Sequence, residues 1–371
     1  MNQLERFFDN VWVDAFWRLL VVFALVVLVV LVLTYVERKF IGRIQMRLGP
    51  MRTGPYGILQ PLADTVKVLL KEDLRPQTAD RIAFELAPFL TFVPVFLTLL
   101  ALPFTESWGV RILGLGLLYF IAVSGLTVLG YIIAGWASDN KYGLLGAMRA
   151  AAQLISYEIP MVLAVLALAM LASSLNLVEI VEKQGRVPFI VWQPLGFFIF
   201  MAAAVSDLTR RPFDVAAAES EVAGGPWIEF SGIRWSILYA LTEYTNMFAL
   251  SVLGSLLFLG GWDWPLGREL GWWWQLVLIF VKTTALILII MWATASFPRV
   301  RVDQLMAFCW KLLLPLALVQ IFVNGLILVY EWPDWTLLVT SGLTLLAGAY
   351  VIYTSLRTPA QVRRIAARSE A

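Results

Sequence analysis

Residues 205–244 read VSDLTRRPFDVAAAESEVAGGPWIEFSGIRWSILYALTEY, and they decide the fold because they place charge between two long apolar runs. This stretch contains six acids and three arginines. The acids are Asp207, Asp214, Glu219, Glu221, Glu229 and Glu243, and the arginines are Arg210, Arg211 and Arg234. Ionisable groups held near hydrocarbon are costly, and by default they mark a proton or substrate path. A single acid could be a solvated loop residue, but six acids with arginines beside them indicate a charged cavity.

The sequence on either side of this stretch is strongly apolar. Hydrophobic residues make up 60% of the 371 residues, charged residues make up 15%, and the mean hydropathy is +0.79. A soluble core needs less apolar surface than this, and a bilayer core about 30 Å thick takes roughly 20 apolar residues per helix. The apolar stretches, of which the fifth is short, are 14–36, 82–104, 112–136, 150–172, 189–206, 235–260, 272–295, 311–330 and 335–356. The sequence therefore predicts an all-α polytopic membrane protein with about nine transmembrane helices.

The residue types needed for a redox centre are almost missing from the chain. It has no His, and Cys309 is its single Cys. The lack of His excludes haem held by His and the usual zinc and non-haem iron sites, and one Cys cannot hold an iron–sulfur cluster or form an intrachain disulfide. We also find no P-loop, dinucleotide glycine motif, nucleophile triad or nucleic-acid signature. We expect no metal site in this chain.

Basic residues are distributed unequally between the loops, which predicts the topology. Most Lys and Arg fall in the loops 37–81, 137–149, 207–234 and 297–310 and in the tail 357–371. The opposite side holds only Arg6, Arg18, Arg111, Lys183, Arg186 and Arg268. By the positive-inside rule the N-terminus lies outside and the C-terminus lies in the cytoplasm, a parity that nine spans satisfy. Residues 1–13 are polar, so we expect a signal-anchor rather than a cleavable signal peptide. We expect residues 1–371 to form a single membrane domain whose working surface faces the cytoplasm.

The first cytoplasmic loop contains an expected amphipathic helix. Gly-Pro occurs at 49–50 and again at 54–55, which predicts tight turns. Apolar residues then recur at helical spacing between Ile58 and Leu70, with Asp64 and Lys67 on the other side. Such a helix lies at the membrane interface. It could be a surface anchor next to anionic lipid, or it could wall a cavity that opens near the membrane surface.

Glu158 and Glu243 are the two acids expected to lie deepest in the membrane. Each is about eight residues inside its span from the cytoplasmic end, which is roughly 12 Å at 1.5 Å per residue. Two carboxylates at equal depth on different spans could share one polar pocket. They could instead serve a structural ion pair or an interhelical hydrogen bond. Lys282, near the middle of the seventh span, is a plausible counter-charge and equally a candidate for a structural pair.

The loop at 297–305 carries alternating charge. It reads FPRVRVDQL, with Arg299, Arg301 and Asp303 two residues apart. This pattern could simply follow the positive-inside rule. Together with the loop at 207–234, it could instead close an entry that is lined by acids and flanked by arginines.

Four groups of motifs, in this order along the chain, resemble one family. They are ERK at 37–39, RLGPMRTGPYG at 47–57, QPLAD at 60–64 and KED at 71–73; GWASDNKY at 135–142 and SYE at 156–158; RRPFD at 210–214, ESE at 219–221, EFSG at 229–232 and EY at 243–244; and PRVRVDQL at 298–305. Together they resemble the H subunit of bacterial NADH–quinone oxidoreductase (respiratory complex I), the counterpart of mitochondrial NADH dehydrogenase subunit 1.

The resemblance implies a fold and a function. It implies eight core helices over about 14–330, an added helix at 335–356, and a location in the bacterial inner membrane. The chain would form the membrane part of the quinone chamber and link quinone reduction to proton translocation. Quinone would be a substrate, and the flavin and iron–sulfur clusters would sit in partners. Those partners would be the hydrophilic arm at the cytoplasmic face and the antiporter-like and small membrane subunits.

The resemblance also assigns residues to roles. The proton-coupling acids would be Glu37, Glu158, Asp207, Asp214, Glu219, Glu221, Glu229 and Glu243. The quinone chamber or its entrance would be lined by Arg38, Arg47, Arg52, Ala63, Asp64, Phe230, Arg299 and Arg301.

Three positions depart from the family pattern. Many relatives have Glu where Ala217 stands, some carry an acid where Gly125 stands, and Glu is common where Asp207 stands. A proton path through those sites would be re-routed in this chain. Two other functions stay open on the residues alone: the homologous subunit of a membrane-bound hydrogenase, and a stand-alone proton-coupled transporter, which the lack of a repeat disfavours.

Overall fold

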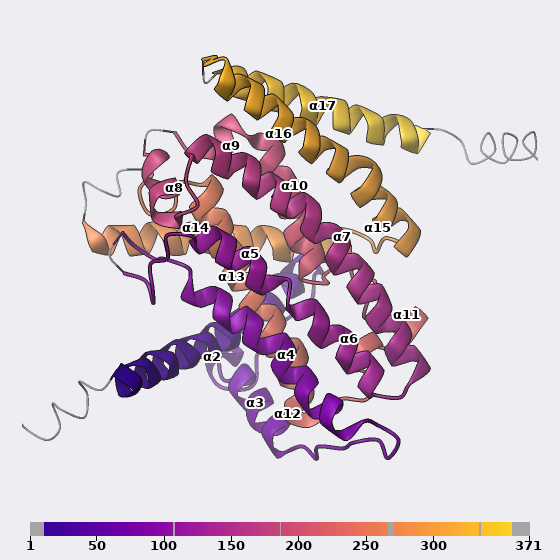
Figure 1. Ribbon diagram of the computed structural model, residues 1–371. Helices are drawn as coiled ribbons and strands as arrows, with labels where there is room; N and C mark the ends of the chain where they lie inside the picture. The colour runs from indigo at the N-terminus through magenta and orange to yellow at the C-terminus, as the bar shows by residue number, and fades with distance from the viewer. Residues whose placement is uncertain (1–10, 107, 186, 266–270, 334, 358–371) are drawn as a thin grey trace, which may run out of the picture.

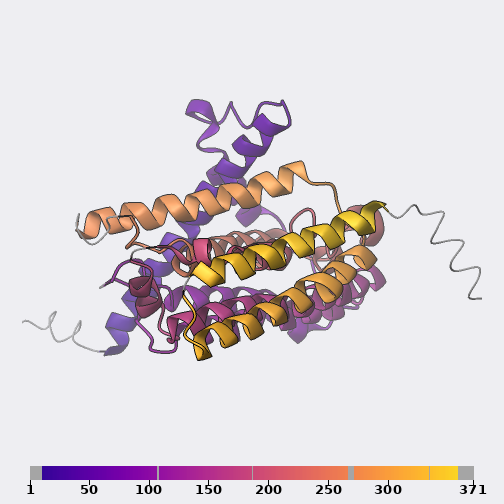
Figure 2. The same cartoon turned by 90° about the horizontal axis from the view of Figure 1, so that it is seen from above.

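The computed structural model describes residues 11–357 except 107, 186, 266–270 and 334. Within these residues the chain is helical and contains no strand; the pair Pro103 and Gly109 forms an isolated bridge in the loop after α4. The helices lie side by side in one bundle, with α2 leaving it at one edge and α16 and α17 covering another (Figures 1 and 2). The all-α fold is confirmed.

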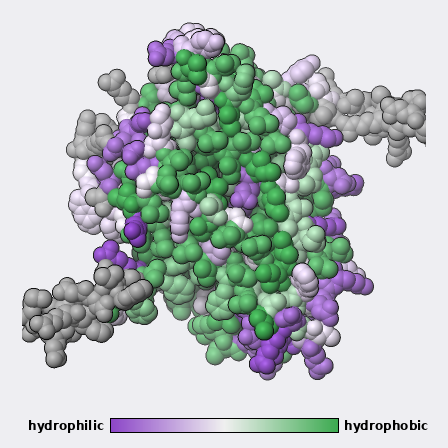
Figure 3. All heavy atoms as spheres, viewed as in Figure 1, coloured by the Kyte–Doolittle hydropathy of each residue, from purple (hydrophilic) through white to green (hydrophobic). Residues whose placement is uncertain are grey.

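Six helical segments are long and apolar enough to cross a membrane. They are Phe16–Ile44 within α2, Arg81–Leu100 (α4), Gly116–Ala137 (α5 and α6), Lys141–Ala172 (α7), Trp272–Ser296 (α14) and Val302–Val329 (α15 to α16). Two shorter apolar segments are Pro194–Asp207 (α10) and Trp335–Val351, the latter within α17 (Trp335–Arg357). Hydrophobic residues cover most of the face in Figure 3, and hydrophilic residues gather towards its edges.

Each of the nine predicted stretches contains a helix, but nine complete crossings stay a prediction. The fifth stretch is divided into α9 (Phe189–Trp192) and α10 at Pro194, the first residue of α10. The sixth is divided into α12 (Gly232–Trp235), η3 (Ser236–Leu241) and α13 (Thr242–Phe258). Proline lacks the N–H that a continuous helix would need, which explains the first division.

Several helix ends differ from the predicted ones. The apolar pattern predicts that the first span ends at 36, but α2 (Val11–Ile44) continues to Ile44. The loop predicted at 137–149 is helical from Lys141, where α7 (Lys141–Ala172) begins with Asn140 as its cap. Hydropathy marks only the part of a helix that lies in hydrocarbon, and 32 residues of α7 extend about 48 Å. The polar ends therefore belong to the helices and not to loops.

Two helices contain a π-turn, which is a helical turn that holds one more residue than a turn of α-helix. η3 lies directly before α13, and η4 (Cys309–Leu313) joins α15 (Val302–Phe308) to α16 (Leu314–Val329). Such turns occur frequently at functional sites. η4 is held against α7, because Cys309 Sγ donates to the Ser156 carbonyl at 3.0 Å.

The loop after α10 folds back into the bundle. Its elements are α11 (Glu219–Val222) and η2 (Gly225–Trp227), and η2 packs between α6 (Thr127–Ala137) and α7. A Cβ on Gly146 would lie only 2.3 Å from Gly225 Cα, and a Cβ on Gly225, whose φ is 63°, would lie only 2.0 Å from the Ala216 carbonyl oxygen of its own loop. Glycine at these two positions therefore permits the close approach.

The expected amphipathic helix is confirmed as α3 (Gln60–Leu70). Its apolar residues Leu62, Val66 and Leu69 are exposed. In the turn before it, Gly54 of the second Gly-Pro pair has a φ of 71°, and Gly57 has a φ of 80°. The end of α3 is joined to the start of α12, because Leu74 N donates to Ser231 Oγ at 2.9 Å and Ser231 Oγ donates to the Glu72 carbonyl at 3.3 Å.

Remaining short elements complete the order. They are η1 (Pro55–Gly57), α5 (Gly116–Ser124) and α8 (Leu177–Lys183). The main hydrophobic core lies between α7, α10 and α13, and a second core surrounds Phe84, Trp227 and Phe230 at the ends of α4 and α6. The acids of the candidate site lie next to these two cores.

Candidate functional site

The loop after α10 is joined to α2 by a buried ion pair. Arg210 Nη1 lies 2.6 Å from Glu37 Oε1, and the two side chains are only 7% and 14% exposed. The guanidinium also lies over the Tyr244 ring, 4.8 Å from its centroid. Glu37 Oε2 and Arg210 Nε have no hydrogen-bond partner among the described residues. The pair thus sits in a low-dielectric place with part of its hydrogen-bonding capacity unused.

Arg210 is a permanent cation in this site. Burial alone would lower its pKa, but the charge of Glu37 and of the other acidic groups around it outweighs burial and leaves the pKa of Arg210 above its ordinary value. Its charge therefore stays constant at any working pH, and the acids around it are the groups that can change.

Glu243 lies next to this ion pair at the first turn of α13. It is 3% exposed, and its Oε1 accepts a hydrogen bond of 2.9 Å from Thr209 Oγ1. Thr209 has a φ of 47°, which carries the chain from α10 towards Arg210. Glu243 and Arg210 are close enough to interact electrostatically. The acid predicted at this depth is therefore buried and in contact with the charged loop.

Asp207 ends α10 and faces the same region as Glu243. Asn246 Nδ2, one helical turn beyond Glu243 on α13, donates to Asp207 Oδ2 at 2.8 Å. Asp207 and Glu243 line one crevice with Tyr131 and Asn246, and in this conformation it has no room for a water molecule. Any transfer through the crevice requires these side chains to move.

Glu158 is not among the residues that line the crevice with Glu243, so one pocket shared by the two acids stays a prediction. Asp207 is the acid that interacts electrostatically with Glu158. Glu158 lies on α7 and Asp207 on the neighbouring α10, which packs along α7 and separates it from α13. Asp207 therefore connects the two acids.

Lys282 is not the counter-charge of Glu158 or Glu243. Its Nζ donates to the carbonyls of Leu259, Gly261 and Trp264 at 2.6, 2.5 and 2.5 Å. These carbonyls end α13 and form the turn after it, far along the helix from Glu243. Lys282 satisfies backbone groups that the end of a helix leaves without partners.

The predicted turn at Arg299 meets the loop after α10. Arg299 Nη2 donates to the Asp214 carbonyl and lies 3.8 Å from Asp214 Oδ1, and Asp214 and Glu243 interact electrostatically. Arg301 is exposed and precedes α15, where its backbone N–H donates to Gln304 Oε1 at 3.3 Å. Of the two arginines, Arg299 is the one that contacts an acid of the stretch 205–244.

Three predicted acids lie away from this group, near the ends of α6 and α7. Asn140 Nδ2 donates to Glu229 Oε1 at 2.6 Å. Arg149 forms an ion pair with Glu221. Glu219 begins α11, and its side chain lies outside the described structure. Phe230 stacks on Phe84 with centroids 4.1 Å apart, so it belongs to the second core.

The first loop places its predicted residues along α3 and before it. Arg38 pairs with Asp64, which also accepts a hydrogen bond of 3.0 Å from Gln60 Nε2. Ala63 and Arg52 are exposed, and so is Arg47, whose Nε donates to Gln45 Oε1 at 2.8 Å. The structure brings Arg38 and Asp64 together and leaves the other three on the surface.

Glu37 pairs with Arg210, Arg210 interacts electrostatically with Glu243, Glu243 shares a crevice with Asp207, and Asp207 interacts electrostatically with Glu158. The neutral residues that join them are not among those predicted from the sequence: Thr209, Asn246, Tyr131 and Tyr244. Asn246 could have been found, because it lies three residues after Glu243 and shares its helix face. Among the described residues no group of three or more His, Cys, Asp or Glu has the arrangement of a metal site.

Comparisons with known proteins agree with the resemblance. A family model described as NADH dehydrogenase matches residues 17–325. The H subunit of NADH-quinone oxidoreductase from Dehalococcoides mccartyi (strain CBDB1) is 45% identical over 317 residues, which is 85% of this chain and 88% of that protein. The protein of the same name from Geobacillus thermodenitrificans (strain NG80-2) is 51% identical over 309 residues, 82% of this chain and 92% of that protein. The H subunit from Brevibacillus brevis (strain 47) is 46% identical over 323 residues, which is 86% of this chain and 96% of that protein.

Proposed function

Since the chain belongs to the NADH dehydrogenase family, together with the H subunit of NADH-quinone oxidoreductase, we propose that it forms the membrane part of the quinone chamber and couples quinone reduction to proton translocation. It is a multi-pass membrane subunit of an oxidoreductase complex, so other subunits of complex I are its partners. The hydrophilic arm would hold the flavin and iron–sulfur clusters at the cytoplasmic face, with the N-terminus outside and the C-terminus in the cytoplasm of a bacterial inner membrane.

The single observation that carries this proposal is the series of neighbouring acids around the buried Glu37–Arg210 ion pair. It begins at Glu37 with Arg210, continues to Glu243 and Asp207, and reaches Glu158 on α7. Reduction of a quinone takes up protons and changes the charge beside the first pair. Arg210 keeps its own charge, so the change acts on the carboxylates that face it. A shift of protonation then passes from Glu243 towards Glu158.

The chamber itself would lie on the side of the bundle where the first loop, α3 and the loop after α10 meet. Arg38 with Asp64 and Arg299 with Asp214 are held there by ion pairs. The exposed apolar face of α3 would wall a lateral opening to the membrane. Quinone would enter as a substrate and leave as quinol.

The test replaces Glu243 by Gln in the assembled complex. Glu243→Gln keeps the shape and the hydrogen bond to Thr209 but removes the proton that titrates. We expect normal assembly and normal NADH oxidation with a hydrophilic artificial acceptor, because that reaction occurs in partner subunits. Proton pumping coupled to quinone reduction should fall sharply.

The matched control is Glu331→Gln, which changes an exposed acid between α16 and α17. It should leave both activities normal. Near-normal pumping in Glu243→Gln would show that this acid has a structural role, and the proposed path would then be wrong.

A further inference from the structure

The outer half of α2 leaves an apolar cavity that the proposed function does not use. The cavity has a volume of about 660 Å³ and lies between α2, the loop after α4 and α13. Its floor is buried, with Val26 5% exposed, while Val21 at its rim is 54% exposed. A volume of this size is within the range of small-molecule sites, about 300–1,000 Å³. The cavity is therefore a groove that opens sideways.

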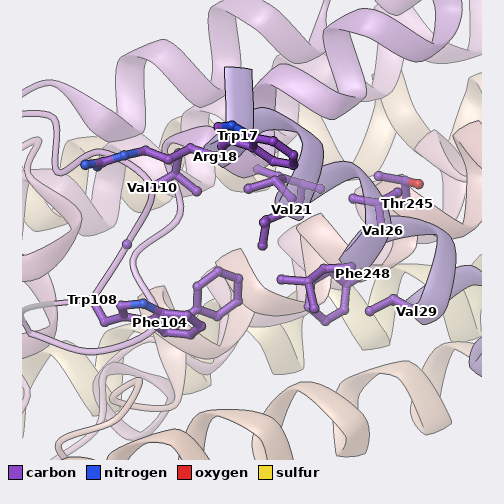
Figure 4. Close-up of a pocket in the computed structure, with 14 residues that line it drawn as sticks. Trp17, Arg18, Val21, Val26, Val29, Phe104, Trp108, Val110, Thr245 and Phe248 are labelled. Atoms are coloured by element: carbon purple, nitrogen blue, oxygen red, sulfur yellow. The ribbon is translucent and has the colours of Figure 1, made fainter. Parts of the chain in front are cut away.

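The groove has one polar end and one apolar end. Figure 4 shows Arg18, Trp108 and Val110 at one end and Val29 and Phe248 at the other. Thr245 is the other polar residue in the lining, and its hydroxyl donates to the Leu241 carbonyl of its own helix at 2.6 Å. Apart from Thr245, whose hydroxyl is already hydrogen-bonded, the side chains that line the groove beyond Arg18 are aliphatic or aromatic.

The length of the groove matches one leaflet of a bilayer. From Arg18 to Val29 the helix rises eleven residues, which is about 16 Å at 1.5 Å per residue. This is close to half of a hydrocarbon core about 30 Å thick. A transmembrane helix of a partner would need a groove about twice as long. Aromatic residues such as Trp17 and Trp108 are typical of the headgroup level, where the polar end would lie.

We propose that this groove is a phospholipid site, with one acyl chain along α2 as far as Val29 and an anionic phosphate at Arg18. The lipid would come from the leaflet on the side where α2 begins. The guanidinium complements the phosphate charge, and the indole N–H groups of Trp17 and Trp108 can donate to the phosphate or glycerol oxygens. A neutral quinone has no negative charge to pair with the Arg18 guanidinium. The bound lipid fills the space that α2 leaves as it diverges from the bundle.

The test uses the assembled complex in phosphatidylglycerol vesicles that contain a trace of phosphatidylglycerol with a photoreactive group on its acyl chain. After irradiation, labelled peptides are mapped. We expect labelling of Val21–Val29 and Leu99–Val110 to exceed labelling of the exposed face of α17. Val22→Trp fills the groove and should reduce this labelling several-fold, whereas Leu346→Trp on α17 should leave it unchanged. Val29→Phe is a milder second variant at the apolar end, and it should give a smaller loss of the same kind.

Arg18→Gln tests the headgroup separately. It should lower labelling by the phosphatidylglycerol probe about fivefold, which corresponds to about 1 kcal/mol, the contribution of one basic residue near an anionic membrane surface. Arg18→Lys should restore most of it. Equal labelling of the groove and of α17 would overturn the proposal. So would stronger labelling by a photoreactive quinone, or cross-linking of Val21 to a partner subunit. None of these outcomes bears on the pumping assay for Glu243.

Discussion

Glu158 lies against Gly125, with its Oε1 only 2.5 Å from the place that a Cβ would occupy on that glycine. Gly125 follows the last residue of α5, at the position where the resemblance predicts an acid in some members of the family. The side chain that a relative would place there would occupy the space that the Glu158 carboxyl group fills in this chain. Glycine at position 125 therefore leaves the space that the Glu158 carboxyl group occupies.

Gly125→Ala should displace the Glu158 carboxyl group without preventing assembly, because the far end of a flexible side chain can move. We expect coupled proton pumping to fall by about tenfold, since misplacing a reacting group by ~1 Å can cost up to about 10²-fold. Gly342→Ala is the control, because nothing lies within 4 Å of a Cβ at that position. Pumping measured in vesicles against quinone reduction distinguishes the two variants, and equal pumping would contradict the prediction.

Arg210→Gln should impair assembly more than the double variant Glu37→Gln/Arg210→Gln. Removing one member of a buried pair leaves an uncompensated charge, at a cost of about 3–5 kcal/mol, whereas removing both avoids that charge. The yield of assembled complex on a native gel and its thermal midpoint measure the difference. If the double variant is no more stable than Arg210→Gln, the two side chains are not energetically coupled.

Lys282→Gln should destabilise the chain but not change its coupling. It removes the ammonium from three carbonyls at the end of α13, and each buried group left without a partner costs about 1–3 kcal/mol. Less complex should assemble, yet the number of protons pumped per quinone reduced should stay normal. A changed ratio would place Lys282 in the proton path after all.

Single cysteines test the orientation. Met46 and Tyr330 are 95% and 66% exposed, and they lie on opposite sides in the predicted topology. With Tyr330→Cys, a membrane-impermeant thiol reagent should label intact cells, and with Met46→Cys it should label only inverted vesicles. The native Cys309 is buried and gives little background. The reverse pattern would move the series of acids to the other side of the membrane. Gly267, which the predicted topology also places outside, lies beyond the described residues.

The apolar runs are sufficient to predict the helices, but not where they end. Hydropathy reports the part of a helix in hydrocarbon, so the sequence predicts a loop where α7 continues back to Lys141. The positions of Glu243 and Asp207 in the sequence likewise mark them as unusual, because acids within or beside apolar runs are rare. Their partners Thr209 and Asn246 are neutral and common, and only the packing of α10 on α13 brings them together.

Lys282 shows a different limit of the sequence. A cation in the middle of a span suggests an acid as its partner, and Lys282 does interact electrostatically with Asp263. Its three hydrogen bonds nevertheless go to backbone carbonyls at and after a helix end, which the sequence does not indicate. The residues matched by resemblance alone, such as Ala63 and Arg52, are exposed, so their assignment to the chamber stays a prediction.

The π-turn at η3 divides the helix from Gly232 to Phe258 into two parts, and the side chains of the second part are rotated about the helix axis relative to a continuous α-helix. Its first part is fixed by the contact of Ser231 with the end of α3, and its second part aims Glu243 at the crevice. One residue corresponds to about 100° of rotation, so the same sequence wound as a continuous α-helix would turn Glu243 away from Asp207. Deleting one residue from 236–241 would instead convert the π-turn to an α-turn and keep both parts in place. A sequence alignment with a relative that places a one-residue gap on the wrong side of this turn would pair Glu243 with a residue that faces a different side of the helix. The spacing of these residues thus carries information that their identities do not.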